Sequence, residues 1–272
     1  MIDDLTAADA AYLASLAPAA PSAYHRLNPL TKAVAAIVCS LGAFVLGGYV
    51  GPLAILLGGI IPSAIWARLL GRLLRISILL SLPIAISVVL VSVFTRAGTT
   101  VVFTIGPFDA TLEGVDFAGQ VLVRLLVLST AIGLFGLTTD PRALVFDLER
   151  RGMSPKLGFA AVATVEAVPT MIERASVIQA AQRARGLDTE GRLIARLRGI
   201  MPMVGPVLLS SLTEVEERSL ALEVRAFGRP GRRNLLWWPG DTSAERVVRW
   251  VLVVGFLGLV AARATGLLPR IP

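Results

Sequence analysis

The stretch "AVAAIVCSLGAFVLGGYVGPLAILLGGIIPSAIWA", residues 33–67, decides the class of the fold because it contains no charged residue. A helix needs about 20 apolar residues to cross the hydrocarbon core of a bilayer. This run is too long for one crossing, and the glycines and proline of "GGYVGP" (47–52) interrupt it near its middle. The stretch therefore predicts a helical hairpin in a membrane, turning between Gly47 and Pro52.

The rest of the chain extends this prediction to an all-α integral membrane protein. Apolar residues make up 55% of the sequence, and the mean hydropathy is +0.73. A soluble domain has an apolar share of about 45–50%. We expect about five transmembrane helices, at residues 33–49, 51–67, 76–95, 120–139 and 247–264. Arg124 falls near the start of the fourth, where its side chain is expected to reach the interface.

The placement of charge predicts the orientation. Residues 68–75 carry three arginines and no acid, whereas residues 96–119 carry one arginine and three acids. Basic loops stay on the cytoplasmic side, so the first loop is expected inside and the second outside. The predicted organisation is a cytoplasmic N-terminal segment (1–31), transmembrane helices 1–4 (32–140), a cytoplasmic helical region (141–245), and a C-terminal transmembrane helix with its tail (246–272).

The cytoplasmic region is predicted to contain long amphipathic helices along the membrane interface. Two of its runs, "VIQAAQRARG" (177–186) and "SLALEVRAFG" (219–228), end in an arginine and then a glycine, which follows directly in the first run and three residues later in the second. Each is typical of a helix end, because a basic residue complements the helix dipole and glycine accepts the left-handed turn. Two such ends on one membrane face also suit a different role, since the planar guanidinium of arginine pairs well with carboxylates of a partner.

Several kinds of site are disfavoured by the residues present. A phosphate-binding loop needs glycines followed by Lys-Ser or Lys-Thr, and Lys32 in "NPLTKAV" and Lys156 in "MSPKLGF" lie in other contexts. We therefore expect no enzyme, and any ATP-driven work must come from another subunit. His25 and Cys39 are the only histidine and cysteine, which argues against a His/Cys metal site.

The acidic residues have simpler roles than catalysis. Asp140 and Asp147 are too far apart for the clustered aspartates of a magnesium-dependent transferase, and Asp140 with Pro141 is typical of a helix start. The acids of "EVEER", Glu214, Glu216 and Glu217, precede Arg218 and Arg225 on one helix and are expected to pair with arginines there.

These features together resemble the transmembrane coupling (T) component of energy-coupling factor (ECF) ABC importers, the CbiQ/EcfT-like family. The opening "HRLNPLTK" (25–32) is similar to the family's Asp-Pro-Arg-Thr-Lys stretch, with Asn28 in place of Asp and Leu30 in place of Arg. The family's first Ala-Arg-Gly motif is intact. In the second, the arginine is kept, but valine replaces the alanine before it and alanine replaces the glycine after it. The motif positions are Ala184, Arg185 and Gly186, then Val224, Arg225 and Ala226, followed by Phe227 and Gly228.

The resemblance implies a coupling role in micronutrient uptake, of vitamins or metal ions, across the plasma membrane of a prokaryote. Two cytosolic ATPase subunits would bind the two helix ends, with Arg185 and Arg225 as contacts and Arg185 the more important. The apolar faces around residues 156–170 and 200–212 would hold a separate small membrane subunit that binds the substrate. ATP and Mg²⁺ would bind to the ATPases, this chain would bind no cofactor directly, and no nucleic acid is expected.

Two other functions also fit the sequence. The chain could be the permease of another ATP-driven transporter and line the substrate path itself, or it could be a membrane-embedded transferase. Such permeases usually present one coupling segment per chain, whereas two arginine-ended helices are expected here.

Overall fold

The computed structural model describes residues 22–95, 100–105, 108–186, 193–227 and 239–266. The chain divides into two compact units. The first comprises Met1–Leu144 and Pro239–Pro272, and the second comprises Val145–Trp238.

The first unit contains the membrane-spanning helices. In chain order its elements are η1 (Ala23–Arg26), α2 (Pro29–Leu46), α3 (Val50–Ile55), η2 (Leu56–Ile60), α4 (Ile61–Trp66), α5 (Leu70–Thr95), β1 (Val101–Ile105), β2 (Phe108–Thr111), α6 (Leu112–Thr138) and α10 (Ser243–Ala264). Helix α7 (Pro141–Arg150) follows α6 and crosses the boundary between the units. The all-α membrane fold is thus confirmed, with one short antiparallel hairpin, β1–β2, that we did not predict.

Four of the five predicted spans coincide with helices long and apolar enough to cross a membrane: Pro29–Leu46, Leu70–Val93, Leu112–Thr138 and Ser243–Ala264. The predicted span at 51–67 forms a shorter apolar helix, Val50–Trp66. A turn of π-helix, η2, interrupts it between α3 and α4. The predicted turn between the first two apolar segments is present, because Gly47 and Gly48 both take positive φ angles, of 62° and 58°.

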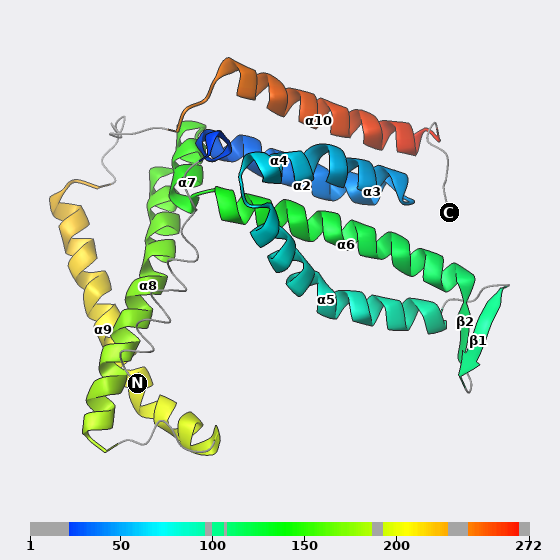
Figure 1. The fold of residues 1–272 in the computed structure, drawn as a ribbon. Helices are drawn as coiled ribbons and strands as arrows, with labels where there is room; N and C mark the ends of the chain where they lie inside the picture. The colour runs from blue at the N-terminus through cyan, green and yellow to red at the C-terminus, as the bar shows by residue number, and fades with distance from the viewer. Residues whose placement is uncertain (1–21, 96–99, 106–107, 187–192, 228–238, 267–272) are drawn as a thin grey trace. The chain divides into compact units, whose positions relative to one another are not determined.

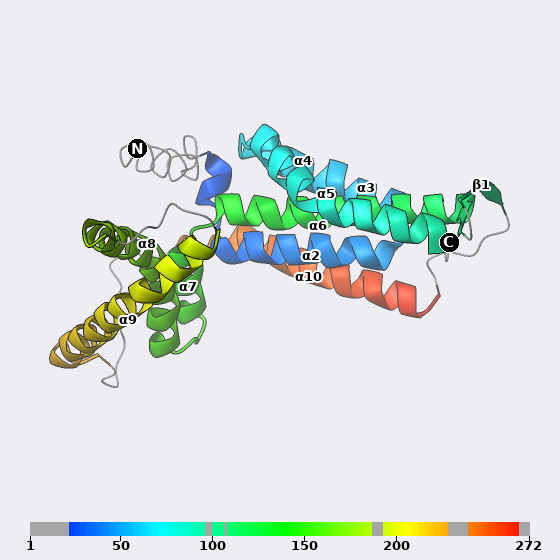
Figure 2. The same cartoon turned by 90° about the horizontal axis from the view of Figure 1, so that it is seen from below.

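Helix α6 lies at the centre of this unit, with α5 along one side and α2 along another (Figures 1 and 2). The core where these helices meet is made mainly of small and aliphatic side chains. They are Ala43, Leu56, Ile60, Ala64, Ala67, Leu69, Leu73, Val127, Ala131 and Leu134, and Tyr24 packs with them. The outward faces are also apolar, with Leu79 of α5 71% exposed. Exposure of apolar side chains on this scale suits helices surrounded by lipid.

The environment of Arg124 corrects one prediction. Helix α6 begins at Leu112, so Arg124 lies about 18 Å along the helix axis at 1.5 Å per residue, rather than near its start. Its Nη2 donates to Gln120 Oε1 (3.3 Å), and Gln120 Nε2 donates to Asp116 Oδ2 (2.9 Å). The cation is therefore accommodated by polar side chains of the same helix, Gln120 and Asp116, and not by extension of its side chain to the membrane interface as predicted.

Helix α10 is held to the start of α2 by a buried polar cluster. Arg249 Nη2 donates to Asp241 Oδ1 (2.7 Å), and its Nη1 donates to Asn28 Oδ1 (3.2 Å) and Thr31 Oγ1 (2.9 Å). The backbone N–H of Asn28 donates in turn to Glu245 Oε1 (2.7 Å). Buried charges need such partners to offset the loss of water. Two residues of "HRLNPLTK", Asn28 and Thr31, thus join helices at opposite ends of the sequence.

The two aspartates considered for magnesium have structural partners. Asp140 Oδ1 accepts from the backbone N–H of Arg142 (2.9 Å) at the start of α7, which confirms the predicted cap. Asp147 is fully buried and accepts from Arg150 (2.7 Å) and Arg151 (2.9 Å) at the end of the same helix. Each carboxylate is thus engaged in ordering α7.

Candidate functional site: the two arginine-ended helices

The second unit is dominated by two long helices, α8 (Pro155–Ala184) and α9 (Leu193–Val224), which cross each other (Figure 1). Ser154 Oγ caps the start of α8 by accepting from Leu157 N, and Pro155 stands at the first helical position, which its missing N–H suits. Both helices begin well before the arginine-ended runs at 177–186 and 219–228. Pro169 lies inside α8.

The two helices run antiparallel. The ring of Phe159, near the start of α8, lies 5.0 Å from the ring of Phe227, just beyond the end of α9. Further along, Arg174 Nη1 of α8 contacts Glu214 Oε2 of α9 at 2.6 Å. The end of α8 at Arg185 lies 26 residues beyond Phe159, which is about 39 Å at 1.5 Å per residue. The two arginine ends therefore lie at opposite ends of the helix pair, as Figure 1 shows.

The first end has the features expected of a glycine-terminated helix. Arg185 N donates to Gln182 O (3.1 Å), and Gly186 N donates to Arg183 O (2.9 Å). Gly186 then takes a φ of 88°, which only glycine adopts freely. The helix ends here, and the exposed side chain of Arg185 lies at the tip of α8.

The second end closes in the same way although it lacks the glycine. Ala226 N donates to Glu223 O and Phe227 N donates to Leu222 O, each at 2.9 Å, which is the hydrogen-bond pattern of a Schellman motif. Ala226 takes a φ of 54°, a left-handed conformation that is unfavourable for alanine. The contact of Phe227 with Phe159 supports this turn.

Six of the seven predicted site residues lie at these two tips, and all six are exposed: Ala184, Arg185, Gly186, Val224, Arg225 and Ala226. Val224 is 88% exposed, a high value for an apolar side chain. The seventh, Gly228, lies outside the described residues. Within the part of the chain that the structure describes, neither the Arg185 nor the Arg225 guanidinium forms an ion pair.

An ion-pair cluster at the helix crossing was only partly predicted. Arg218 Nη2 contacts Glu214 Oε1 at 2.6 Å, which confirms the expected pair within α9. The other oxygen of the same carboxylate binds Arg174, whose Nη1 also lies 3.4 Å from Ser210 Oγ. Sequence reasoning missed this contact between helices, because the spacing of residues on one helix does not show which face of another helix will meet it. Glu216 and Glu217 are exposed on α9, and their pairing remains a prediction.

Both helices also expose many large apolar side chains within their own unit. Those of α8 are Leu157, Val165, Val168, Met171, Ile172 and Val177, and those of α9 are Val204, Leu208, Leu209, Leu212, Val215, Leu220 and Val224. Gly158 is the one buried residue of α8, and no side chain between residues 204 and 224 of α9 is buried. A helix pair with so little core of its own offers its apolar surface to lipid or to other subunits.

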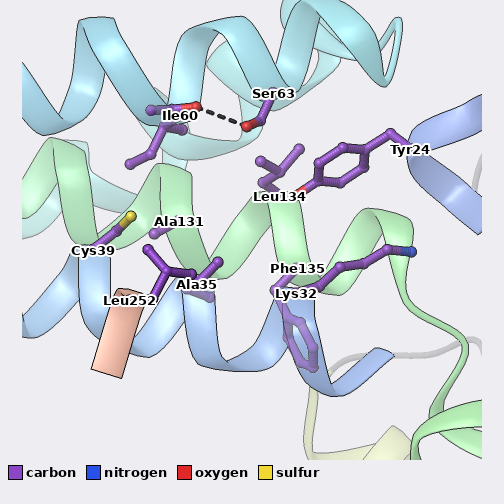
Figure 3. Close-up of a pocket in the computed structure, with 12 residues that line it drawn as sticks. Tyr24, Lys32, Ala35, Cys39, Ile60, Ser63, Ala131, Leu134, Phe135 and Leu252 are labelled. Atoms are coloured by element: carbon purple, nitrogen blue, oxygen red, sulfur yellow. Dashed lines mark hydrogen bonds between the residues drawn. The ribbon is translucent and has the colours of Figure 1, made fainter. Parts of the chain in front are cut away.

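The first unit contains a half-open pocket of about 180 Å³ between α2, α4 and α6 (Figure 3). Its walls are mostly apolar, and Lys32 is the one charged residue among those that line it. Lys32 Nζ donates to Thr138 O (2.8 Å) and His25 O (3.0 Å), and it lies 5.6 Å from the centre of the Tyr24 ring. The cation thus joins η1, α2 and the end of α6, which is a structural role.

Comparison with known proteins agrees with this architecture. Residues 21–235 match the CbiQ family model, described as cobalt transport protein. The chain is 32% identical to the energy-coupling factor transporter transmembrane protein EcfT of Heliobacterium modesticaldum, over 86% of this chain and 92% of the relative. It is also 32% identical to the EcfT of Brevibacillus brevis, over 85% and 92%, and 29% identical to that of Thermosediminibacter oceani, over 82% and 87%. Together with the membrane helices and the crossed, arginine-ended pair, these matches show that the chain belongs to the CbiQ family, as a transmembrane component of energy-coupling factor transporters.

Proposed function

We propose that this chain is the coupling subunit of its transporter, which transmits ATP-driven motion of two cytosolic ATPases to a separate membrane subunit that binds the substrate. The observation that carries the proposal is the pair of helix tips. Arg185 and Arg225 are both exposed, and each precedes a residue with positive φ that ends its helix.

Each tip suits docking into an acidic groove on a partner. A guanidinium can form two parallel hydrogen bonds to one carboxylate, which gives both affinity and orientation. Each arginine stands at the end of a long helix, so a displacement of the groove would move the helix with it. Two tips at opposite ends of one helix pair match two ATPase subunits, one at each tip.

The energy is proposed to come from these partners. ATP and Mg²⁺ would bind to the ATPases and not to this chain, since Lys32 is occupied by two carbonyl groups and Lys156 lies in the first turn of α8 without a preceding glycine-rich loop.

The substrate-binding partner is proposed to be a small, very apolar membrane protein. It would cover the exposed apolar side chains of α8 and α9, including Leu157, Val165 and Val168 within the predicted face 156–170, and Leu208 and Leu212 within 200–212. Residues 200–203 of the second face have side chains outside the described set. The transported substrate would be a micronutrient, a vitamin or a metal ion, and the proposed site is the plasma membrane of a prokaryote with the helix tips on its cytoplasmic side.

Co-purification tests this proposal directly. The tagged chain is expressed in its own cells, solubilised in mild detergent, and the proteins that accompany it are identified by mass spectrometry. We expect two ATPases, or one ATPase in two copies, together with a small apolar membrane protein. The Arg185→Ala/Arg225→Ala variant should lose the ATPases and keep its membrane insertion. The Arg218→Ala variant, which removes an arginine from the side of α9, should keep them.

The contrary outcomes are distinct. Full ATPase association in the double variant would overturn the role of the tips. Recovery of the chain with an ATPase but without a small membrane partner would instead support a permease that lines the substrate path itself.

A further inference from the structure

The ion pair at the crossing of α8 and α9 stands at an equal distance from both helix tips. Arg174 precedes Arg185 by 11 residues, and Glu214 precedes Arg225 by 11 residues. Each distance is about 16 Å at the helical rise of 1.5 Å per residue. A rotation of the two helices about this contact therefore displaces the two tips by similar amounts.

Few other contacts in the described residues fix the crossing. Gly158 is the one buried residue of α8, and the atoms nearest to a Cβ placed there belong to Glu149 of α7. The rings of Phe159 and Phe227 meet about 22 Å from Arg174, as judged by 15 residues of helix at 1.5 Å each. A pair of helices held by so few buried side chains depends on its polar contacts for a defined angle, since close packing is what usually fixes that angle.

The cluster is arranged to hold its arginines in place. The two oxygens of Glu214 are divided, with Oε2 facing Arg174 and Oε1 facing Arg218, each at 2.6 Å. Arg218 belongs to α9 itself and orients the carboxylate, whereas Arg174 belongs to α8 and forms the contact between the helices. The side chains are 33% (Arg174) and 25% (Glu214) exposed, so the pair is partly withdrawn from water. Partial withdrawal strengthens the attraction relative to a fully solvated pair.

From this geometry we propose that Arg174 is a positioning residue, which through its ion pair with Glu214 holds the two arginine-ended helices as one lever, so that displacement of one tip moves the other. The role in transmission rests on the proposed coupling function, whereas the ion pair that fixes the helix crossing is a property of this chain alone. It assigns the cluster a role in transmission, beyond the docking role of Arg185 and Arg225.

The chain offers a matched control for this proposal. Arg174→Ala and Arg218→Ala each remove one arginine from the same carboxylate and change the net charge equally. Only the first removes the ion pair between α8 and α9. Arg174→Lys keeps a cation at the crossing and provides a conservative rescue.

The experiment measures the distance between two labelled positions close to the tips, one on α8 and one on α9. With Cys39→Ser as background, spin labels are placed at Ala181→Cys and Ala221→Cys, two exposed positions each seven residues beyond the crossing. Double electron–electron resonance then records the distance distribution in the purified complex with its co-purified partners, with and without Mg-ATP. Arg185 and Arg225 are neither substituted nor labelled, so the proposed ATPase contacts are kept.

We expect one narrow distribution that shifts as a single population on addition of Mg-ATP, in the otherwise unaltered chain, in Arg218→Ala and in Arg174→Lys. Arg174→Ala should give a broader distribution without a concerted shift. If Arg174→Ala responds to Mg-ATP as Arg218→Ala does, the proposal is wrong even where the ATPases co-purify. If no ATPase co-purifies with any variant, the proposed coupling function fails, and the width of the distribution alone then decides whether Arg174 fixes the crossing.

Discussion

Gly186 and Ala226 occupy the same position at the ends of two different helices, and both adopt left-handed backbone conformations, with φ angles of 88° and 54°. Each directly follows the arginine at the tip, Arg185 or Arg225. The second tip therefore keeps the backbone geometry of the first although its sequence has lost the glycine. The expectation that Arg185 is the more important arginine remains a prediction, but the turn that follows it is not the reason, because Ala226 forms the same turn.

Replacement of Ala226 by glycine is expected to stabilise the end of α9. A left-handed conformation costs a residue with a Cβ atom roughly 1–2 kcal/mol, and glycine avoids this cost. The backbone amides at positions 226 and 227 should exchange with solvent more slowly in the variant than in the unaltered chain. The control is Ala221→Gly, at an exposed position inside α9, where glycine should destabilise the helix by about 1 kcal/mol and speed exchange. Equal effects of the two substitutions would contradict the strained turn.

Gly114 is expected to tolerate no side chain. A Cβ atom there would lie 2.6 Å from the backbone oxygen of Ser92 and 3.1 Å from Val93 Cα, at the end of α5. Backbone atoms cannot move aside as a side chain can, so Gly114→Ala should separate α5 from α6 and destabilise the protein by about 1–3 kcal/mol.

Gly136 provides the control in the same helix, because a Cβ atom there meets nothing within 4 Å. Gly136→Ala should leave stability unchanged or slightly increased, since alanine favours the helix. Thermal unfolding of the detergent-solubilised chains, followed by tryptophan fluorescence, measures both. A Gly114→Ala variant as stable as Gly136→Ala would show that the two helices pack less closely than described.

Arg249 is expected to be necessary for the attachment of α10. Its side chain is 8% exposed and its ion-pair partner Asp241 is 9% exposed. Loss of one partner from a buried pair costs about 3–5 kcal/mol, because the other charge remains buried without compensation. Arg249→Ala should therefore strongly lower the unfolding temperature.

A neighbouring arginine supplies the comparison for this prediction. Arg246 lies 3.9 Å from the same aspartate but is 60% exposed, so Arg246→Ala should cost less than about 1 kcal/mol. If the two substitutions lowered stability alike, the buried cluster would not be what attaches α10 to α2.

The turn at Ser22–His25 is expected to weaken in acid. Burial lowers the pKa of His25 below its ordinary value of 6.5, and the charge of Lys32 lowers it further. Ser22 N donates to Nδ1 of the neutral ring (3.3 Å), and protonation of Nδ1 removes this acceptor. Because the folded pKa lies below the unfolded one, the stabilisation is complete above pH 6.5 and is lost as the pH falls through the folded pKa.

The measurement is simple because His25 is the only histidine. Its ring resonance in NMR should titrate with a midpoint below 6.5, and Lys32→Met should raise that midpoint by removing the nearby charge. A midpoint at or above the ordinary value would contradict the burial of this ring.

The positions of most membrane helices could be predicted from the uncharged runs, because a bilayer excludes unpaired charges and sets a minimum length for an apolar helix. The runs at 33–49 and 76–95 became helices for that reason. The start of α6 was misplaced because "TLEGVDFAG" (111–119) carries two acids, which looked like a loop. Thr111 caps α6 by accepting from Gly114 N, and the helix thus begins at Leu112.

The sequence by itself determined that this chain crosses a membrane, that two of its helices end in an arginine, and which family these features resemble. Those properties depend on local composition and spacing. Only the tertiary structure decided that Arg174 meets Glu214 across two helices, that Asn28 meets Arg249 from the other end of the chain, and that Ala226 adopts the turn of a glycine. These depend on which helix faces pack together and on contacts that outweigh an unfavourable local conformation, and neither can be read from the residues of one segment.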